Sequence, residues 1–72
     1  MSKPILGIIG GGQLGSMLAM AAKKIDIKTI VLSDDENAPA QKFSDEFIYG
    51  KYNNENVINQ FVNQSDVITF EF

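Results

Sequence analysis

The chain has 72 residues, 44% of them hydrophobic, and six Lys or Arg against nine Asp or Glu give it a net charge of −3. This length can bury only one small core. The acidic balance excludes a basic footprint for nucleic acid or an anionic membrane. The sequence contains no cysteine and no histidine, which excludes disulfides, thiolate metal sites and the commonest general base. We see no signal peptide and no apolar run of about 20 residues, and we therefore expect a cytoplasmic chain.

The first predicted element, residues 5–9, is an unbroken apolar run typical of a central parallel strand. It ends in a glycine-rich loop, where Gly10, Gly12 and Gly15 fit the pattern G-x-G-x-x-G. In this pattern the first glycine makes a tight turn, the second lets the backbone approach a ligand, and the third lets helix and strand pack closely. No Lys-Ser or Lys-Thr follows, which argues against a P-loop NTPase site.

A helix of about three turns is predicted to begin at Gln13. Positions 10–13 hold no Ser, Thr, Asp or Asn, so the first N–H groups of this helix lack a side-chain cap and are available to an anion. Glycine-rich turns also arise for packing alone, and the spacing leaves both roles open. The predicted buried stripe of the helix consists of Leu14, Met17, Leu18, Ala21 and Ile25.

A second buried strand is predicted at residues 28–32, which completes a right-handed βαβ unit. Asp34 and Asp35 lie in the polar loop that follows. In dinucleotide-binding folds an acid near this position holds a ribose hydroxyl, but consecutive acids are also typical of a solvated turn. Both interpretations remain open for this loop.

The rest of the chain continues the alternation of helices and strands. We predict a short helix from Asn37 to near Phe43 and a third strand at residues 46–49. Asn53 or Asn54 would cap the next helix. The predicted buried stripe of this helix is Val57, Ile58, Phe61 and Val62.

Residues 66–72 form the fourth predicted strand. Together these elements predict an α/β fold: a Rossmann-like, three-layer βαβ domain whose parallel sheet has the order 3-2-1-4, truncated at the fourth strand. Because that strand would be an under-covered apolar edge, we expect a fragment of a longer protein that tends to self-associate.

Several segments closely resemble one enzyme family. They are residues 8–15, Met17-Leu18-Ala19, residues 38–40, Asp45 and residues 66–72. The chain resembles, over nearly its whole length, the N-terminus of N5-carboxyaminoimidazole ribonucleotide synthetases, the ATPase subunits of phosphoribosylaminoimidazole carboxylase. The resemblance implies the first, pre-ATP-grasp domain of a three-domain ligase that carboxylates 5-aminoimidazole ribonucleotide with bicarbonate in the purine (IMP) pathway. ATP and Mg²⁺ would be bound by later domains that this chain lacks.

The resemblance also implies a substrate-binding site, at which the glycine loop and a glutamate from the fourth strand meet. The implied residues are Gly10, Gly11, Gly12, Gln13, Leu14, Gly15 and Glu71. It implies neither a catalytic residue nor a metal ligand in this chain, so we expect no cofactor and no activity of the chain alone. The complete enzyme is expected to be a homodimer. Family members commonly carry a basic residue where this chain has Ser16, and an aspartate where it has Ser33.

Two other interpretations remain. The related formate-dependent glycinamide ribonucleotide transformylases have a similar loop, but that loop usually carries an acid where this chain has Gln13. A non-catalytic regulatory module that binds NAD or another nucleotide would need a ribose-binding acid, for which Asp34 and Asp35 are the candidates.

Overall fold

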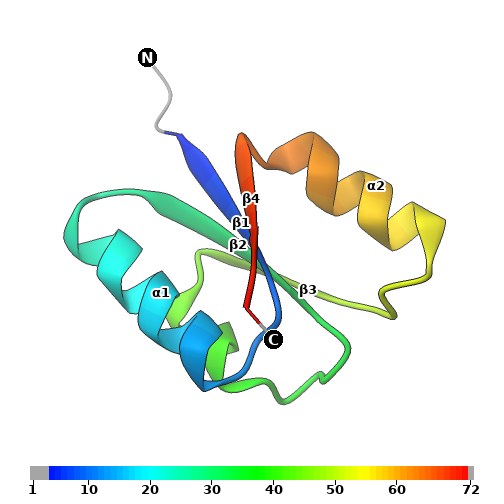
Figure 1. Cartoon of the computed structure of the whole chain (residues 1–72), viewed down its shortest axis with the longest axis horizontal. Helices are drawn as coiled ribbons and strands as arrows, with labels where there is room; N and C mark the ends of the chain where they lie inside the picture. The colour runs from blue at the N-terminus through cyan, green and yellow to red at the C-terminus, as the bar shows by residue number, and fades with distance from the viewer. Residues whose placement is uncertain (1–3, 72) are drawn as a thin grey trace.

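A four-stranded parallel sheet forms the central layer of the computed structural model, which describes residues 4–71 (Figure 1). The strand order is β3-β2-β1-β4, which confirms the predicted order 3-2-1-4. The strands are β1 (Ile5–Ile9), β2 (Lys28–Ser33), β3 (Glu46–Tyr49) and β4 (Val67–Phe70). The helical elements are α1 (Gln13–Lys24), the 3₁₀ helix η1 (Pro39–Phe43) and α2 (Glu55–Gln64).

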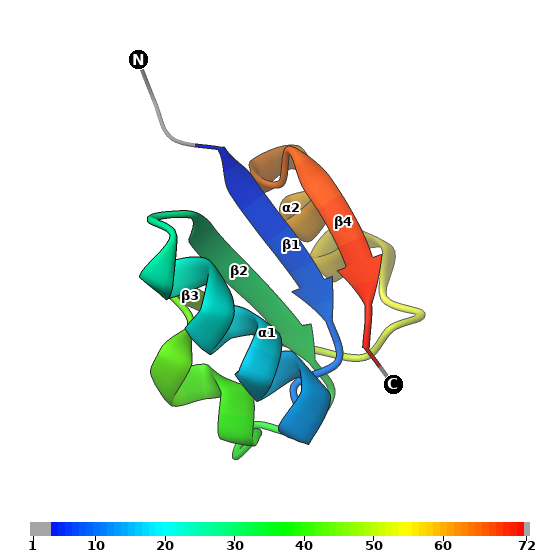
Figure 2. The same ribbon diagram turned by 60° about the vertical axis from the view of Figure 1, so that its left-hand side comes forward.

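The helices cover opposite faces of the sheet, so the domain has the three predicted layers. Figure 2 shows α1 on one face and α2 on the other. Side chains of neighbouring residues in β1 point to these opposite faces, as the pleat requires. The α1-side cluster contains Ile8, Ala19, Val31 and Ala40. The α2-side cluster contains Ile9, Ile30, Leu32, Ile48 and Phe61.

Helix α1 packs on the sheet through small side chains, and this corrects the predicted buried stripe. Its buried residues are Gly15, Ser16, Ala19 and Ala22. The predicted stripe points outward instead: Leu14, Met17 and Ile25 are 61%, 57% and 69% exposed, and Ala21 is also exposed. Of the predicted set, Leu18 alone packs against the α1-side cluster. Small side chains are buried here because the helix lies close to the sheet. At Gly15 even an added Cβ would overlap the carbonyl oxygen of Gly10.

Helix α2 packs in a different way, around one large side chain. Phe61 is fully buried, and an added Cβ on Gly7 of β1 would lie 2.7 Å from the Cζ atom of its ring. Val57 and Ile58 pack against the α2-side cluster as predicted. Val62 is 46% exposed, so its predicted burial is wrong. Helix α2 contacts β1, β2 and β3, and Val62, which follows Phe61, lies on the side of the helix that faces solvent.

Side-chain hydrogen bonds fix the amino ends of α2, β1 and β2. Of the two asparagines that could cap α2, Asn54 does so: its Oδ1 accepts from the N–H groups of Asn56 and Val57 at 3.0 and 3.3 Å. At the amino ends of the strands, the carboxylate of Asp66 accepts from Ile5 N at 2.7 Å. The carboxylate of Asp45 accepts from Thr29 N at 2.9 Å.

Most predicted boundaries hold, with three adjustments. Strand β2 extends to Ser33, and the short helix is a 3₁₀ helix that begins at Pro39. Strand β4 covers only the middle of the predicted range 66–72, and Phe72 lies outside the described residues. Across residues 4–71 there is no helix with the length and apolar character of a membrane span.

Candidate functional site

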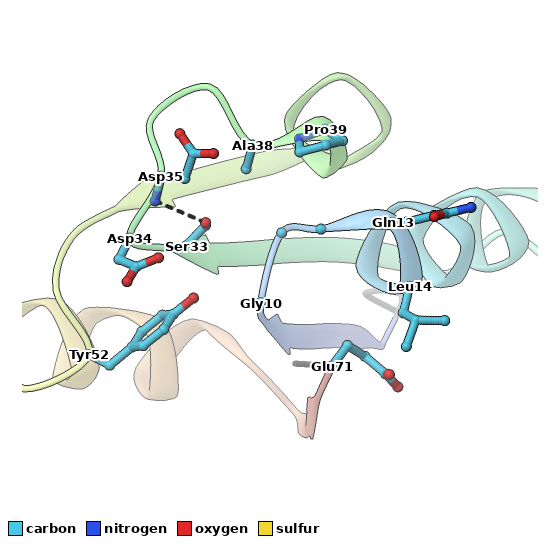
Figure 3. Close-up of a pocket in the computed structure, with 12 residues that line it drawn as sticks. Gly10, Gln13, Leu14, Ser33, Asp34, Asp35, Ala38, Pro39, Tyr52 and Glu71 are labelled. Carbon is cyan, nitrogen blue, oxygen red and sulfur yellow. Dashed lines mark hydrogen bonds between the residues drawn. The ribbon is translucent and has the colours of Figure 1, made fainter.

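A cavity of about 400 Å³ opens at the carboxyl ends of the strands, where open α/β sheets bind ligands (Figure 3). Its volume is within the range of small-molecule sites. Its walls come from the glycine loop, the β2–η1 loop, the β3–α2 loop and the end of β4. The lining residues are Gly10, Gly11, Gly12, Gln13, Leu14, Ser33, Asp34, Asp35, Ala38, Pro39, Tyr52 and Glu71.

The three glycines of the G-x-G-x-x-G pattern have separate roles. Gly10 has φ 111°, a conformation that side chains rarely adopt, and its N–H donates to Leu32 O at 2.9 Å. An added Cβ on Gly15 would overlap the carbonyl oxygen of Gly10, so this glycine permits close packing of helix on strand. Gly15 is buried and does not line the cavity. Around Gly12 an added Cβ would meet no atom within 4 Å, so this position keeps space open beside the cavity.

Gly11, which lies at a variable position of the glycine pattern, connects the glycine loop to η1. Its carbonyl oxygen accepts from Ala40 N at 2.9 Å, and an added Cβ would lie 2.6 Å from the Cβ of Ala38. The glycine loop is therefore attached directly to η1 and to the loop before it. This contact brings Ala38 and Pro39 into the cavity wall.

The amino end of α1 faces this loop without a side-chain cap, as the sequence predicts. Gly12 is the N-cap residue, and the first turn contains no acidic residue. The hydroxyl of Ser16 donates to Gly12 O at 3.0 Å, so this buried side chain links the first turn of α1 to the glycine loop. Unpaired N–H groups and the helix dipole make such an end favourable for an anionic group.

The acidic loop after β2 forms a second wall, and its hydrogen bonds distinguish its residues. The hydroxyl of Ser33 accepts from Asp35 N at 3.1 Å. One carboxylate oxygen of Asp35 accepts from Asn37 N at 2.9 Å, which makes Asp35 a turn-forming residue. Asp34 lines the cavity and does not take part in this set of hydrogen bonds.

Tyr52, which the sequence analysis did not single out, lies in the β3–α2 loop. It is half-buried, packs against the α2-side cluster and lines the cavity. A signal was available, because Tyr52 follows a strand at the same carboxyl edge as the glycine loop. In Figure 3 its ring lies on the side of Asp34, away from Gln13 and Leu14.

Glu71 enters the cavity from the end of β4, next to the glycine loop. Its N–H donates to Ile9 O at 2.8 Å, which continues the pairing of β4 with β1 and fixes the residue in place. The cavity thus brings Glu71 together with Gly10, Gly11, Gly12, Gln13 and Leu14. Its charged lining residues are Asp34, Asp35 and Glu71, with no Lys or Arg from residues 4–71. An acidic lining favours the hydrogen-bond donors of a ligand.

The whole chain, residues 1–72, matches the family model of the ribonucleotide synthetase preATP-grasp domain. The chain belongs to this family. An N5-carboxyaminoimidazole ribonucleotide synthase of Staphylococcus aureus (strain COL) is 48% identical over 67 residues, which are 93% of this chain and 18% of the relative. The corresponding synthase of Staphylococcus epidermidis is 46% identical over the same length.

Solved structures of such synthetases have the same fold as this preATP-grasp domain. The S. aureus synthetase in complex with ADP superposes with a TM-score of 0.92 and 45% identity, over 99% of this chain and 20% of that one. The Thermotoga maritima synthetase gives 0.90 and 39%, over 96% and 19%. The chain therefore spans about a fifth of the length of these relatives and corresponds to their N-terminal preATP-grasp domain.

Proposed function

We propose that this preATP-grasp domain is the substrate-binding part of an N5-carboxyaminoimidazole ribonucleotide synthase. That enzyme would use ATP to join bicarbonate to the exocyclic amine of 5-aminoimidazole ribonucleotide, in the cytoplasm. The observation that carries the proposal is one cavity in which Glu71 and the glycine loop meet. It lies in a chain that is 48% identical to such a synthase over 67 residues.

The residues of the cavity suit the proposed nucleotide. Its phosphate would lie at the uncapped start of α1, beside the open space at Gly12. A carboxylate such as that of Glu71 accepts hydrogen bonds from hydroxyl or amine groups of the same molecule. Because Lys and Arg are absent from the described lining, the remaining part of a full-length enzyme would have to supply cations for the phosphate.

The same reasoning assigns the chemical step to other domains. Among residues 4–71, no three His, Cys, Asp or Glu side chains are grouped so that they could hold a metal ion. The glycine loop also lacks a phosphate-binding lysine. We therefore place the sites of ATP, Mg²⁺ and bicarbonate outside this domain, and we expect the 72-residue chain alone to be inactive. Phosphoryl transfer needs positioning and charge neutralisation that half of a site does not supply.

A chimera tests this function. The chain replaces the matching 67-residue N-terminal segment of the S. aureus synthase, and ADP formation is measured with ATP, bicarbonate and 5-aminoimidazole ribonucleotide. We expect turnover that depends on the aminoimidazole ribonucleotide. A chimera that folds, as judged by its thermal melting, but forms no ADP in response to this nucleotide would overturn the proposal.

Gly12→Val in the same chimera tests the site itself. The added side chain meets no protein atom at its Cβ and enters space that the ligand needs, so we expect turnover to fall more than tenfold at limiting nucleotide. Met17→Val is the matched control, because Met17 is exposed on the same helix and does not line the cavity. Equal turnover of the two variants would show that the glycine loop does not contact the nucleotide.

A further inference from the structure

Three acidic residues follow β2, and the structure gives each of them a different environment. The carboxylate of Asp35 accepts the Asn37 N–H and is thereby committed to the turn. Glu36 is exposed and does not line the cavity. Asp34 lines the cavity, and its carboxylate has no hydrogen bond or ion pair with any of residues 4–71. Of the two that line the cavity, Asp35 has one carboxylate oxygen held in the turn, whereas both carboxylate oxygens of Asp34 face solvent and a ligand without a hydrogen bond to residues 4–71.

We propose that the carboxylate of Asp34 binds the ribose hydroxyls of the nucleotide, which makes Asp34 a specificity-determining residue. This inference rests on the proposed function and deepens it. A carboxylate is purely an acceptor of hydrogen bonds, and the two neighbouring hydroxyls of a ribose supply two donors. Hydrogen bonds of this kind, with one charged partner, are shorter and stronger than neutral ones.

The position of Asp34 in the sheet suits a sugar better than a phosphate. Asp34 directly follows the last residue of β2, and β2 is paired with β1, which leads into the glycine loop. Neighbouring strands lie about 4.8 Å apart, so a phosphate at the start of α1 leaves the sugar about one strand away, at the end of β2. A carboxylate repels a phosphate but attracts hydroxyl groups, which favours the sugar over the phosphate at Asp34.

Glu71 lies on the opposite side of the cavity from Asp34 and is too distant to bind the same hydroxyls. It follows β4, which pairs with β1 on the side opposite to β2, so the ends of β2 and β4 are about 10 Å apart. Figure 3 shows Asp34 beside Tyr52 on one side of the cavity, and Glu71 below Leu14 on the other. The two carboxylates therefore contact different groups of one nucleotide, and Glu71 is left for the donors of the aminoimidazole.

The experiment compares Asp34→Asn with Glu36→Gln in the chimera described above. Each variant removes one negative charge from the same loop, but only the first changes the cavity lining. The substrates are 5-aminoimidazole ribonucleotide and its 2′-deoxy analogue. We expect Asp34→Asn to raise the KM for the ribonucleotide about tenfold to hundredfold with little change in kcat, since one charge-assisted hydrogen bond is lost. Glu36→Gln should leave both constants unchanged.

The deoxy analogue separates a ribose contact from a general effect of charge. The unmodified chimera should prefer the ribonucleotide about tenfold or more, and Asp34→Asn should lose most of this preference. An Asp34→Asn variant that matches Glu36→Gln, or one that keeps the full preference, would overturn the inference while the activity of the unmodified chimera still supports the proposed function. A folded, unmodified chimera without turnover would instead overturn both.

Discussion

The two helical layers of this domain cover the same sheet by opposite means. Helix α1 buries Gly15, Ser16, Ala19 and Ala22, and most of its large apolar side chains, Leu14, Met17 and Met20, are exposed. Helix α2 buries a single large ring, Phe61, above Gly7 of β1. In the α1 layer the large buried side chains come from the sheet, whereas in the α2 layer the helix supplies one of them.

The difference shows how each layer serves the cavity. Gly15 lets the first turn of α1 lie against the backbone of Gly10 in the loop after β1, and the amino end of the helix is thereby held at the edge of the sheet. The α2 layer contains the large ring of Phe61, and its cluster supports Tyr52 in the loop before the helix. One layer therefore positions the glycine loop, and the other supports the facing wall.

The largest effect is expected from the anchor of the α2 layer. Phe61→Ala should lower the free energy of unfolding by about 3–5 kcal/mol, because a fully buried ring is replaced by a cavity. That is a large part of the total stability of a domain of this size. Urea unfolding of the 72-residue chain measures the change. Val62 is adjacent to Phe61 but 46% exposed, so Val62→Ala should lower the free energy of unfolding by less than about 1 kcal/mol. Equal losses of stability in the two variants would contradict the described packing.

The close approach of the α1 layer is tested by Gly15→Ala. The added methyl group overlaps Gly10 O, so we expect a loss of about 1–3 kcal/mol, although alanine favours helix by about 1 kcal/mol over glycine. Gly12→Ser is the control, since its added atoms meet open space and its hydroxyl can cap the helix. Chemical denaturation of both variants compares them. An alanine at position 15 that stabilises the chain would refute close packing as the role of this glycine.

A smaller effect is expected at the edge of the sheet that both layers leave uncovered. Val67 and Phe70 of β4 are exposed, and β4 pairs only with β1 among the described strands. We expect the isolated chain to self-associate at tens of micromolar, and Val67→Lys to weaken this association because edge lysines oppose strand pairing. Sedimentation velocity measures it, with Met20→Lys on α1 as the control. A monomeric chain at these concentrations would show that the edge needs no cover.

The smallest effect is expected on the outer face of α1. Met17→Ala should change the free energy of unfolding by less than about 0.5 kcal/mol, because Met17 is 57% exposed. The predicted buried stripe would instead require a loss of about 2–5 kcal/mol. Leu18→Ala on the same helix, packed against the α1-side cluster, should cost clearly more than Met17→Ala in the same urea titration. A larger loss of stability for Met17→Ala than for Leu18→Ala would show that the stripe predicted from hydrophobicity is the buried face.

The sequence by itself determined the succession of elements and the edge of the sheet at which the cavity lies. Apolar runs at residues 5–9, 28–32 and 46–49 define strands because their patterns are local properties of the chain. Helical spacing and caps such as Asn54 are local in the same sense. Parallel strands then bring their carboxyl ends to one edge, which agrees with the meeting of Glu71 and the glycine loop that the family resemblance implied.

Only the tertiary structure decided which face of α1 is buried and which acid of the loop after β2 is held in the turn. The stripe of Leu14, Met17 and Ile25 and the stripe of Gly15, Ala19 and Ala22 both have helical spacing, and hydrophobicity favours the first. The close approach of helix and sheet selects the second stripe. That approach depends on how two elements pack together, which the local pattern of the helix alone does not encode. Likewise, Asp34 and Asp35 are equivalent in the sequence and both line the cavity, but one carboxylate oxygen of Asp35 accepts the Asn37 N–H, whereas the carboxylate of Asp34 has no such hydrogen bond.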